Sequence, residues 1–152
     1  MNSDLEDKVV LVTGGAGGIG SVISKSFAEQ GARVIVHYNH SKENAEKISK
    51  EIDGLAVNAD LTDSKQTKEL FKHIIEKEGK IDVCIANAGK YPKDYAPLWD
   101  IENDRWENTI STNLSLTYNT SRYFLKHVAQ TKNGSLVLIG STAGIYGEAG
   151  HA

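Results

Sequence analysis

A cluster of glycines stands between a short β-branched run and a longer segment whose apolar residues have helical spacing. The cluster reads Thr13-Gly-Gly-Ala-Gly-Gly-Ile-Gly20 and directly follows Val9–Val12. A helix that begins at such a turn presents unpaired N–H groups and a partial positive charge. The segment therefore predicts a phosphate-binding turn, in which Gly14 turns the chain, Gly18 admits a pyrophosphate and Gly20 lets the helix pack closely. A glycine-rich turn without a ligand is the alternative.

Short apolar runs alternate with longer amphipathic segments along the whole sequence. This alternation is typical of βαβ units, and near-continuous apolar runs indicate strands covered on both faces by helices. We therefore expect one domain, 1–152, with an α/β fold and a doubly wound parallel sheet of about five strands. The expected strands are Val9–Thr13, Arg33–His37, Gly54–Ala59, Ile81–Asn87 and Ser135–Gly140.

Helices are expected between these strands because apolar residues recur there at helical spacing. The first helix should pack Ile19, Val22, Ile23 and Phe27 on the sheet, and a glycine at its C-terminal end should stop it. The helices are expected from about Gly18 to Gly31, after Ser41, from about Thr62 or Asp63, and from about Asp104 to Ala129.

Composition excludes several classes of function. The formal charge is −3 and no basic stripe occurs, so we expect neither a nucleic-acid partner nor a membrane partner. No apolar run approaches the ~20 residues that cross a bilayer, and the polar N-terminus is unlike a signal peptide. Cys84 is the only cysteine, which fits a reducing compartment, and we expect a cytoplasmic protein. The histidines, including His151, lack ligand spacing, so no metal site is expected.

Further motifs follow the glycine cluster in chain order. Asp60 and Leu61 stand after the third expected strand, Asn87-Ala88-Gly89 closes the fourth, Asn113 lies inside the long helical segment and Ser141 follows the fifth strand. Together with the Thr-Gly-x-x-x-Gly-Ile-Gly spacing, these motifs resemble the short-chain dehydrogenase/reductase family over the whole chain. The resemblance implies a Rossmann-type sheet in the strand order 3-2-1-4-5 that is incomplete at its C-terminal end, so that the fifth strand is expected to be an apolar edge.

The resemblance also implies an activity and a set of site residues. Family members move a hydride between a nicotinamide and a carbonyl/alcohol substrate, so NADP or NAD is the implied cofactor. Ser141 is the implied catalytic serine and Asn113 the implied catalytic asparagine, which interrupts its helix. The residues expected to bind the cofactor are Gly14, Gly17, Gly18, Ile19, Gly20, Tyr38, Asn39, Ser41, Asp60, Leu61, Asn87, Ala88 and Gly89.

The end of the second expected strand bears on the choice between NAD and NADP. An acidic residue there binds the ribose 2′-hydroxyl and repels a 2′-phosphate. Tyr38 occupies this position and the next acid is Glu43. Groups that could accommodate a phosphate are offered by His37, Asn39, His40, Ser41 and Lys42. We therefore favour NADP over NAD. Gly17 argues the other way, since many NADP-preferring members of the resembled family carry a basic residue there.

The family's Tyr-x-x-x-Lys pair does not occur after Ser141 in this sequence, which ends at Ala152. The tyrosine of that pair acts as the acid or base, with its pKa lowered by the lysine. We therefore expect these 152 residues alone to be inactive. A non-catalytic nucleotide-binding or interaction module is the alternative function. Homo-oligomers are common among members of the resembled family, and a homo-oligomer is compatible with this sequence.

Overall fold

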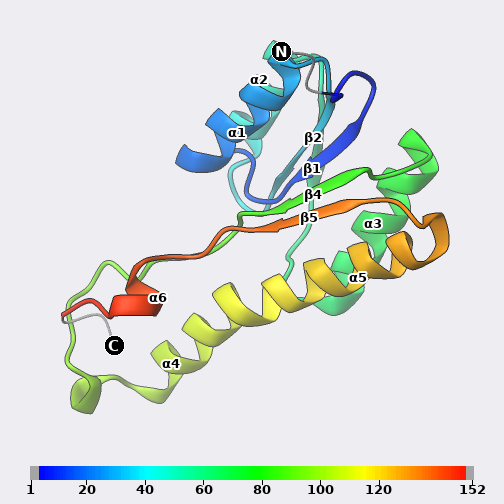
Figure 1. The fold of residues 1–152 in the computed structure, drawn as a ribbon. Coiled ribbons are helices and arrows are strands. Elements are labelled where there is room, and N and C mark those ends of the chain that lie inside the picture. The colour runs from blue at the N-terminus through cyan, green and yellow to red at the C-terminus, as the bar shows by residue number, and fades with distance from the viewer. Residues whose placement is uncertain (1–3, 150–152) are drawn as a thin grey trace.

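A computed structural model of the protein describes residues 4–149 and contains a parallel sheet in the order β3-β2-β1-β4-β5 (Figure 1). Every neighbouring pair in this sheet is parallel. The expected fold class and strand order are confirmed, and each strand lies within two residues of its expected ends. His151 and Ala152 lie outside the described residues. The strands are β1 (Val9–Val12), β2 (Arg33–Tyr38), β3 (Leu55–Asn58), β4 (Val83–Ala86) and β5 (Ser135–Leu138).

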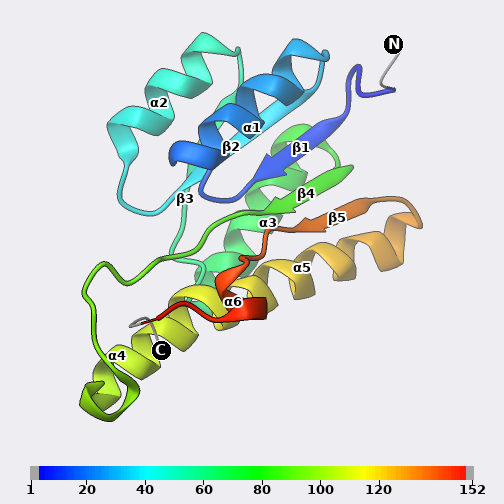
Figure 2. The same cartoon turned by 60° about the vertical axis from the view of Figure 1, so that its left-hand side comes forward.

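Helices cover both faces of the sheet. Helices α1 (Gly18–Glu29) and α2 (Lys42–Glu51) lie on one face, and α3 (Ser64–Glu78) and α5 (Leu116–Thr131) lie on the other (Figure 2). Among residues 4–149, no helix is long and apolar enough to span a membrane. The shorter elements are a 3₁₀ turn (Leu98–Asp100), α4 (Asn103–Ile110), a π-helical turn (Ser111–Ser115) and α6 (Ala143–Tyr146).

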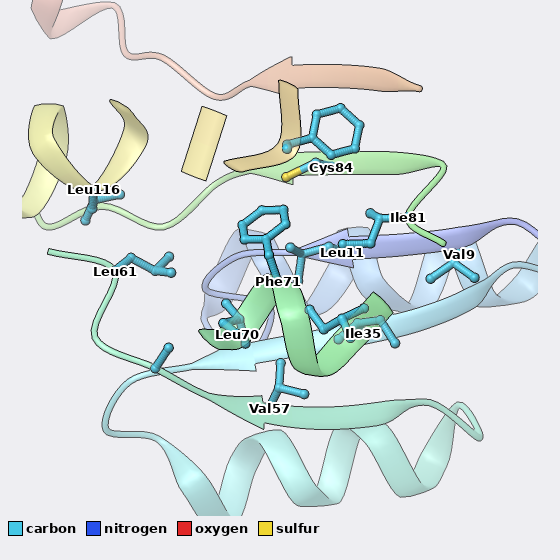
Figure 3. Close-up of a cluster of buried hydrophobic side chains, with 13 residues drawn as sticks. Val9, Leu11, Ile35, Val57, Leu61, Leu70, Phe71, Ile81, Cys84 and Leu116 are labelled. Atoms are coloured by element: carbon cyan, nitrogen blue, oxygen red, sulfur yellow. The ribbon is translucent and has the colours of Figure 1, made fainter. Parts of the chain in front are cut away.

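The two faces of the sheet form two separate apolar clusters, because side chains alternate along each strand. In β1, Val9 and Leu11 face α3 and α5, whereas Val10 and Val12 face α1 and α2. The first cluster is drawn in Figure 3 and includes Cys84 of β4. The Cys84 side chain is fully buried, and burial raises the pKa of its thiol to about 12. The cysteine is therefore a core residue, as its place in a strand predicts.

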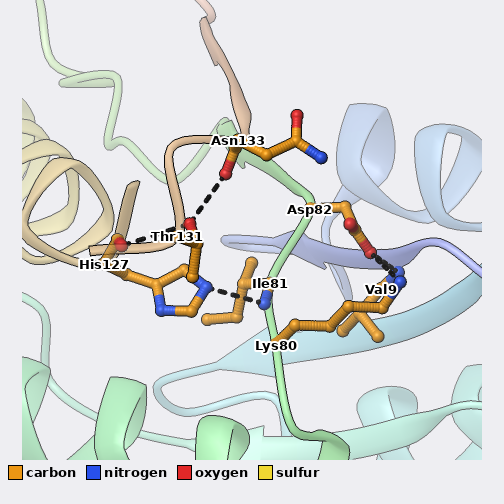
Figure 4. A network of polar contacts seen from close by, with 7 residues as sticks. All are labelled: Val9, Lys80, Ile81, Asp82, His127, Thr131 and Asn133. Carbon is orange, nitrogen blue, oxygen red and sulfur yellow. Dashed lines mark hydrogen bonds and ion pairs between the residues drawn. The ribbon is translucent and has the colours of Figure 1, made fainter. Parts of the chain in front are cut away.

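Polar contacts fix the strand ends opposite the carboxyl edge of the sheet (Figure 4). The backbone N–H of Ile81 donates to Nε2 of the buried His127 at 3.2 Å. The Asp82 carboxylate accepts from the Val9 N–H at 2.9 Å and from the Lys80 ammonium at 2.9 Å. These contacts join α5, the segment before β4 and the start of β1, so the two central strands are held in register at this end.

The inward face of α1 differs from the expectation. Ile19 and Val22 are 65% and 64% exposed, so the prediction that they pack on the sheet is wrong. Gly20 and Ser24 are buried instead, and Ile23 and Phe27 are partly buried against the cluster as expected. The first turn of α1 lies close to the turn after β1, and only small residues fit between them. The side of α1 that carries Gly20 and Ser24 therefore faces the sheet, and Ile19 and Val22 point away from the core.

The long helical segment before β5 is interrupted. Its regular hydrogen bonding is broken by the π-helical turn at 111–115, with Asn113 at the centre. The Asn113 Nδ2 donates to the carbonyl oxygen of Thr109 at 3.0 Å and to that of Lys90, outside the helix, at 2.9 Å. Such π-helical turns occur mostly as single turns and often at functional sites. The interruption at Asn113 is thus present, as the resemblance implies.

Strand β5 lies at one edge of the sheet in the described part of the chain. Leu136 packs partly buried against the core, whereas Val137 is 43%, Leu138 56% and the following Ile139 41% exposed. The expected apolar edge at the fifth strand is therefore confirmed.

Candidate functional site

A cleft of about 820 Å³ lies at the carboxyl ends of the parallel strands. It includes the point between β1 and β4 where the strand order reverses, which is where open α/β sheets bind ligands. Five segments form its walls: the glycine-rich turn, the β2–α2 turn, the loop after β3, the loop after β4 and the π-helical turn. All thirteen residues expected to bind the cofactor line this one cleft.

The glycine-rich turn has the close backbone contacts that its sequence predicts. Gly14 has a φ of +62°, a conformation in which residues other than glycine are strained. A Cβ on Gly20 would lie 2.1 Å from the carbonyl oxygen of Gly14 and 2.8 Å from Nδ2 of Asn87. A Cβ on Gly18 would have no neighbour within 4 Å, so that position faces open space. Gly20 thus lets α1 begin against the turn, and Gly18 leaves the backbone accessible to a ligand.

Thr13 joins the ends of β1 and β4 beneath the cleft. Its buried hydroxyl accepts from the N–H groups of Asn87 and Ala88, both at 3.0 Å, and donates to the carbonyl oxygen of Ile85 at 3.2 Å. The Asn87 Nδ2 donates back to the carbonyl oxygen of Thr13 at 2.9 Å. These reciprocal bonds hold the Asn-Ala-Gly segment beside the glycine-rich turn.

Asn113 connects the π-helical turn to the loop after β4. Its Oδ1 accepts from the Lys90 N–H at 3.0 Å and its Nδ2 donates to the Lys90 carbonyl oxygen at 2.9 Å. A Cβ on Gly89 would lie 2.9 Å from the same Oδ1, so a side chain at this position would push the Asn113 amide away from Lys90. The Asn113 side chain therefore fixes the loop after β4 by its hydrogen bonds to the Lys90 backbone. Asn113 itself is not among the residues that line the cavity.

His37, at the end of β2, is buried beneath the turn and is 2% exposed. Its Nδ1 accepts from the Gly14 N–H at 3.1 Å, and its Nε2 donates to the carbonyl oxygen of Ala59 at 3.0 Å. The ring is therefore neutral with its proton on Nε2. Burial lowers the pKa of His37 to about 4, against smaller opposing effects from the Ala59 carbonyl and the Asp60 carboxylate.

The buried imidazole makes stability depend on pH. Because the pKa of His37 is about 4 in the folded protein and near 6.5 when unfolded, the neutral ring stabilises the fold above pH 6.5. That contribution is lost as the pH falls from 6.5 towards 4 and amounts to about 3 kcal/mol. We expect the free energy of unfolding, measured by urea titration, to decline more between pH 6.5 and pH 4.5 in the wild type than in His37→Asn. Parallel curves would contradict this assignment.

The turn after β2 presents polar groups to the cleft and no carboxylate. Tyr38, Asn39, His40 and Ser41 line this end of the cavity. Ser41 is the N-terminal cap residue of α2, and its hydroxyl makes no capping hydrogen bond, so the oxygen remains accessible. The Asn58 Nδ2 donates to the carbonyl oxygens of Tyr38 and Asn39 at 3.1 and 2.8 Å and holds the turn from β3.

Asp60 is the only carboxylate among the described residues that line the cleft. Its Oδ1 accepts from the backbone N–H and the hydroxyl of Thr62, at 2.9 and 2.7 Å. These bonds shape the loop between β3 and α3. The side chain therefore both organises this wall and places a carboxylate in the lining of the cleft.

Ser141 does not lie with the residues that line the cleft. Its side chain is exposed, its Oγ accepts from the Ala143 N–H at 3.2 Å, and it does not line the cleft. Tyr91, Tyr95 and Tyr146 are likewise at least half exposed and outside the cavity. Among the described residues, no three His, Cys, Asp or Glu side chains group as a metal site. The structure thus brings together the expected cofactor residues but not the two implied catalytic residues.

Several residues have roles in the site that were not expected from the sequence, which identifies Thr13 only as the start of the glycine-rich motif and His37 only as a candidate phosphate contact. His37 and Thr13 lie under the glycine-rich turn, and Lys90, Ser111 and Thr112 line the cleft. The signal available for His37 and Thr13 is a polar residue at the carboxyl end of a buried strand. For Ser111 and Thr112 the sequence has no comparable signal, because the π-helical turn determines their direction.

A parallel α/β sheet in this order, with a glycine-rich turn at its switch point, defines a Rossmann-like protein. A family model described as short chain dehydrogenase matches residues 8–152. The chain therefore belongs to the short-chain dehydrogenase/reductase family, and the resemblance noted in the sequence is confirmed.

Several curated proteins are similar to this chain. The 3-oxoacyl-[acyl-carrier-protein] reductase FabG of Thermotoga maritima is 38% identical over 151 residues, which cover 96% of this chain and 60% of the relative. The NADP-dependent mannitol dehydrogenase of Alternaria alternata is 37% identical over 148 residues, covering 92% and 55% respectively. The FabG reductase of Staphylococcus aureus is 32% identical over 150 residues, covering 95% and 60%. The chain thus spans about 60% of the length of these FabG relatives.

Proposed function

We propose that this chain forms the cofactor-binding part of an NAD(P)-dependent oxidoreductase that acts on a carbonyl/alcohol pair in the cytoplasm. The observation that carries the proposal is the convergence of thirteen residues from separate segments on one cleft at the strand switch point. When bound there, the nicotinamide dinucleotide supplies or accepts the hydride. The oxidoreductase names of the similar proteins support the same class of reaction.

The chain's own groups fit the parts of a dinucleotide. The first-turn N–H groups of α1, which have no partner inside the helix, would bind the pyrophosphate at Gly18 and Ile19. Asp60 and Leu61 would lie beside the adenine, and Asn87, held by Thr13, would lie along the ribose. The size of the cleft, about 820 Å³, is within the range of small-molecule and cofactor sites.

NADP is the cofactor that the β2–α2 turn favours. A 2′-phosphate at this end of the cleft would meet the Ser41 hydroxyl, the Asn39 side chain and the N-terminal N–H groups of α2. No acid among the described cleft residues of this turn would repel it. The name of the Alternaria alternata relative, an NADP-dependent dehydrogenase, agrees with this preference.

For the reaction itself we assign Ser141 to positioning the substrate oxygen by its hydroxyl. Asn113 acts through the Lys90 backbone, which it holds by two hydrogen bonds. Because Ser141 does not line the cleft, a non-catalytic nucleotide-binding module is the competing proposal. A panel of ketones and alcohols with NADPH and NADP⁺ separates the two when it is run on the intact protein, because these 152 residues alone are expected to be inactive. Turnover supports the enzyme, and cofactor binding with no turnover on any substrate supports the module.

The substitution Tyr38→Asp tests the cofactor preference. A carboxylate at the end of β2 is expected to weaken NADPH binding at least about tenfold and to leave NADH binding equal or tighter, because it repels the 2′-phosphate and accepts from the 2′-hydroxyl. Dissociation constants from nicotinamide fluorescence give both values. Tyr38→Asn, which adds no charge, is the control and should retain the preference for NADPH. An unchanged NADPH/NADH ratio in Tyr38→Asp would show that this turn does not contact the 2′-position.

A further inference from the structure

We propose that His37 is a positioning residue for cofactor binding, which acts by fixing the Gly14 N–H through the Nδ1 atom of its ring. The proposal deepens the proposed function and rests on it, since it assigns a task in a cleft that is proposed to bind NADP. No sequence motif includes His37, and its side chain makes two hydrogen bonds to backbone groups in two different walls of the cleft.

Residue 37 binds two consecutive N–H groups of the glycine-rich turn. The Gly14 N–H donates to Nδ1 at 3.1 Å, and the Gly15 N–H donates to the His37 carbonyl oxygen at 2.9 Å. The Gly15 contact uses only the backbone and survives any substitution at 37. The Gly14 contact depends on the side chain, and Gly14 is the residue with the positive φ at which the turn reverses. The imidazole therefore determines the direction of the chain where the turn begins.

Fixing Gly14 also fixes the start of α1. The Gly14 carbonyl oxygen accepts from the Gly17 N–H at 3.0 Å, and it is the atom that would lie 2.1 Å from a Cβ on Gly20. A shift of the Gly14 peptide would therefore move Gly17 and the first turn of α1. Those are the N–H groups proposed to bind the pyrophosphate. His37 controls them through its contacts with the backbone of the turn.

The second ring contact serves a different wall. Nε2 donates to the carbonyl oxygen of Ala59, the residue before Asp60, at 3.0 Å. Two side chains can separate the two contacts, because an asparagine Oδ1 occupies nearly the position of Nδ1, whereas a glutamine Nε2 reaches nearly the position of the histidine Nε2. His37→Asn keeps an acceptor for Gly14 and loses the Ala59 bond. His37→Gln keeps a donor for Ala59 and loses the acceptor for Gly14.

The test compares wild type, His37→Asn and His37→Gln in NADPH titrations followed by nicotinamide fluorescence, with thermal melts of each protein. We expect His37→Asn to bind NADPH within about threefold of the wild type and His37→Gln to bind at least tenfold more weakly. The melting temperatures of the two variants should lie close together, since each loses one buried hydrogen bond. NADPH affinity that is retained in His37→Asn but lost in His37→Gln is a result that a general packing role of the ring would not produce.

Three other outcomes overturn the inference in distinguishable ways. If wild type fails to bind NADPH, the proposed function is wrong and the role of His37 fails with it. If wild type binds and both variants weaken equally, the ring acts as a packing group and not through Nδ1. If His37→Gln binds NADPH as tightly as the wild type does, the Gly14 contact is unnecessary for binding. That conclusion holds even if His37→Asn fails to fold.

Discussion

Gly20→Ala is expected to destabilise the protein by about 3 kcal/mol and to abolish NADPH binding. The added Cβ would lie 2.1 Å from the carbonyl oxygen of Gly14 and 2.8 Å from the Asn87 Nδ2. Neither neighbour can move freely, because the Gly14 N–H is bound by His37 and the Asn87 N–H by Thr13. Relief of the contact must therefore displace α1 or break the turn. Urea unfolding and fluorescence titration with NADPH measure the two effects.

Gly18→Ala is the matched control for this substitution. It makes the same chemical change two residues away in the same helix, where a Cβ would have no neighbour within 4 Å. Stability should stay within about 0.5 kcal/mol of the wild type, since an exposed helical alanine is at least as favourable as glycine. NADPH binding should still weaken, because the methyl group occupies the approach proposed for the pyrophosphate. Equal stabilities for the Gly18 and Gly20 variants would contradict the packing described for α1.

Thr13→Val should cost about 2–4 kcal/mol of folding free energy. Valine has nearly the shape of threonine, so packing at this fully buried position is retained and only the hydroxyl is lost. The oxygen accepts from the N–H groups of Asn87 and Ala88 at 3.0 Å. Removing it leaves the Ala88 N–H without this acceptor, at about 1–3 kcal/mol, and weakens the bonding of the Asn87 N–H, which keeps the carbonyl oxygen of Ile85 at 3.0 Å, by about 1 kcal/mol. The loss is measured by urea unfolding.

Thr13→Ser keeps the hydroxyl and provides the comparison. It removes one buried methyl group, which costs about 1 kcal/mol, and it should retain NADPH affinity. Thr13→Val should bind NADPH at least tenfold more weakly, because Asn87 lines the cleft and depends on this contact. A valine variant as stable as the serine variant would mean that water replaces the hydroxyl as the acceptor.

The strands, the helix positions and the glycine-rich turn could be predicted from the sequence because each depends on a local pattern, whereas the strand order and the other cofactor-lining residues were implied by the family resemblance. Apolar runs such as Val9–Val12 identify strands, and the glycine cluster identifies the turn that follows. Parallel strands then bring their carboxyl ends together, so Asp60 and Asn87 reach the same cleft although they are 27 residues apart in the sequence. The parallel topology therefore brings residues from separate motifs together in one site.

Contacts that depend on the exact approach of two elements could not be predicted. Helical spacing alone placed Ile19 and Val22 inward, whereas the close contact at Gly20 rotates them outward. The bond pair between Asn113 and Lys90 spans 23 residues and requires the π-helical turn. The role of His37 depends on which ring nitrogen faces Gly14. Each of these outcomes is determined by tertiary packing and not by the local sequence.

The central claim is that the cleft at the strand switch point binds a nicotinamide dinucleotide with a preference for NADP. Isothermal titration calorimetry of the wild-type protein with NADPH, and separately with NADH, tests it most directly. We predict one site per chain and at least about tenfold tighter binding of NADPH, with no binding of NADPH to Gly20→Ala. Absence of heat with both nucleotides under conditions where the wild type is folded would contradict the claim.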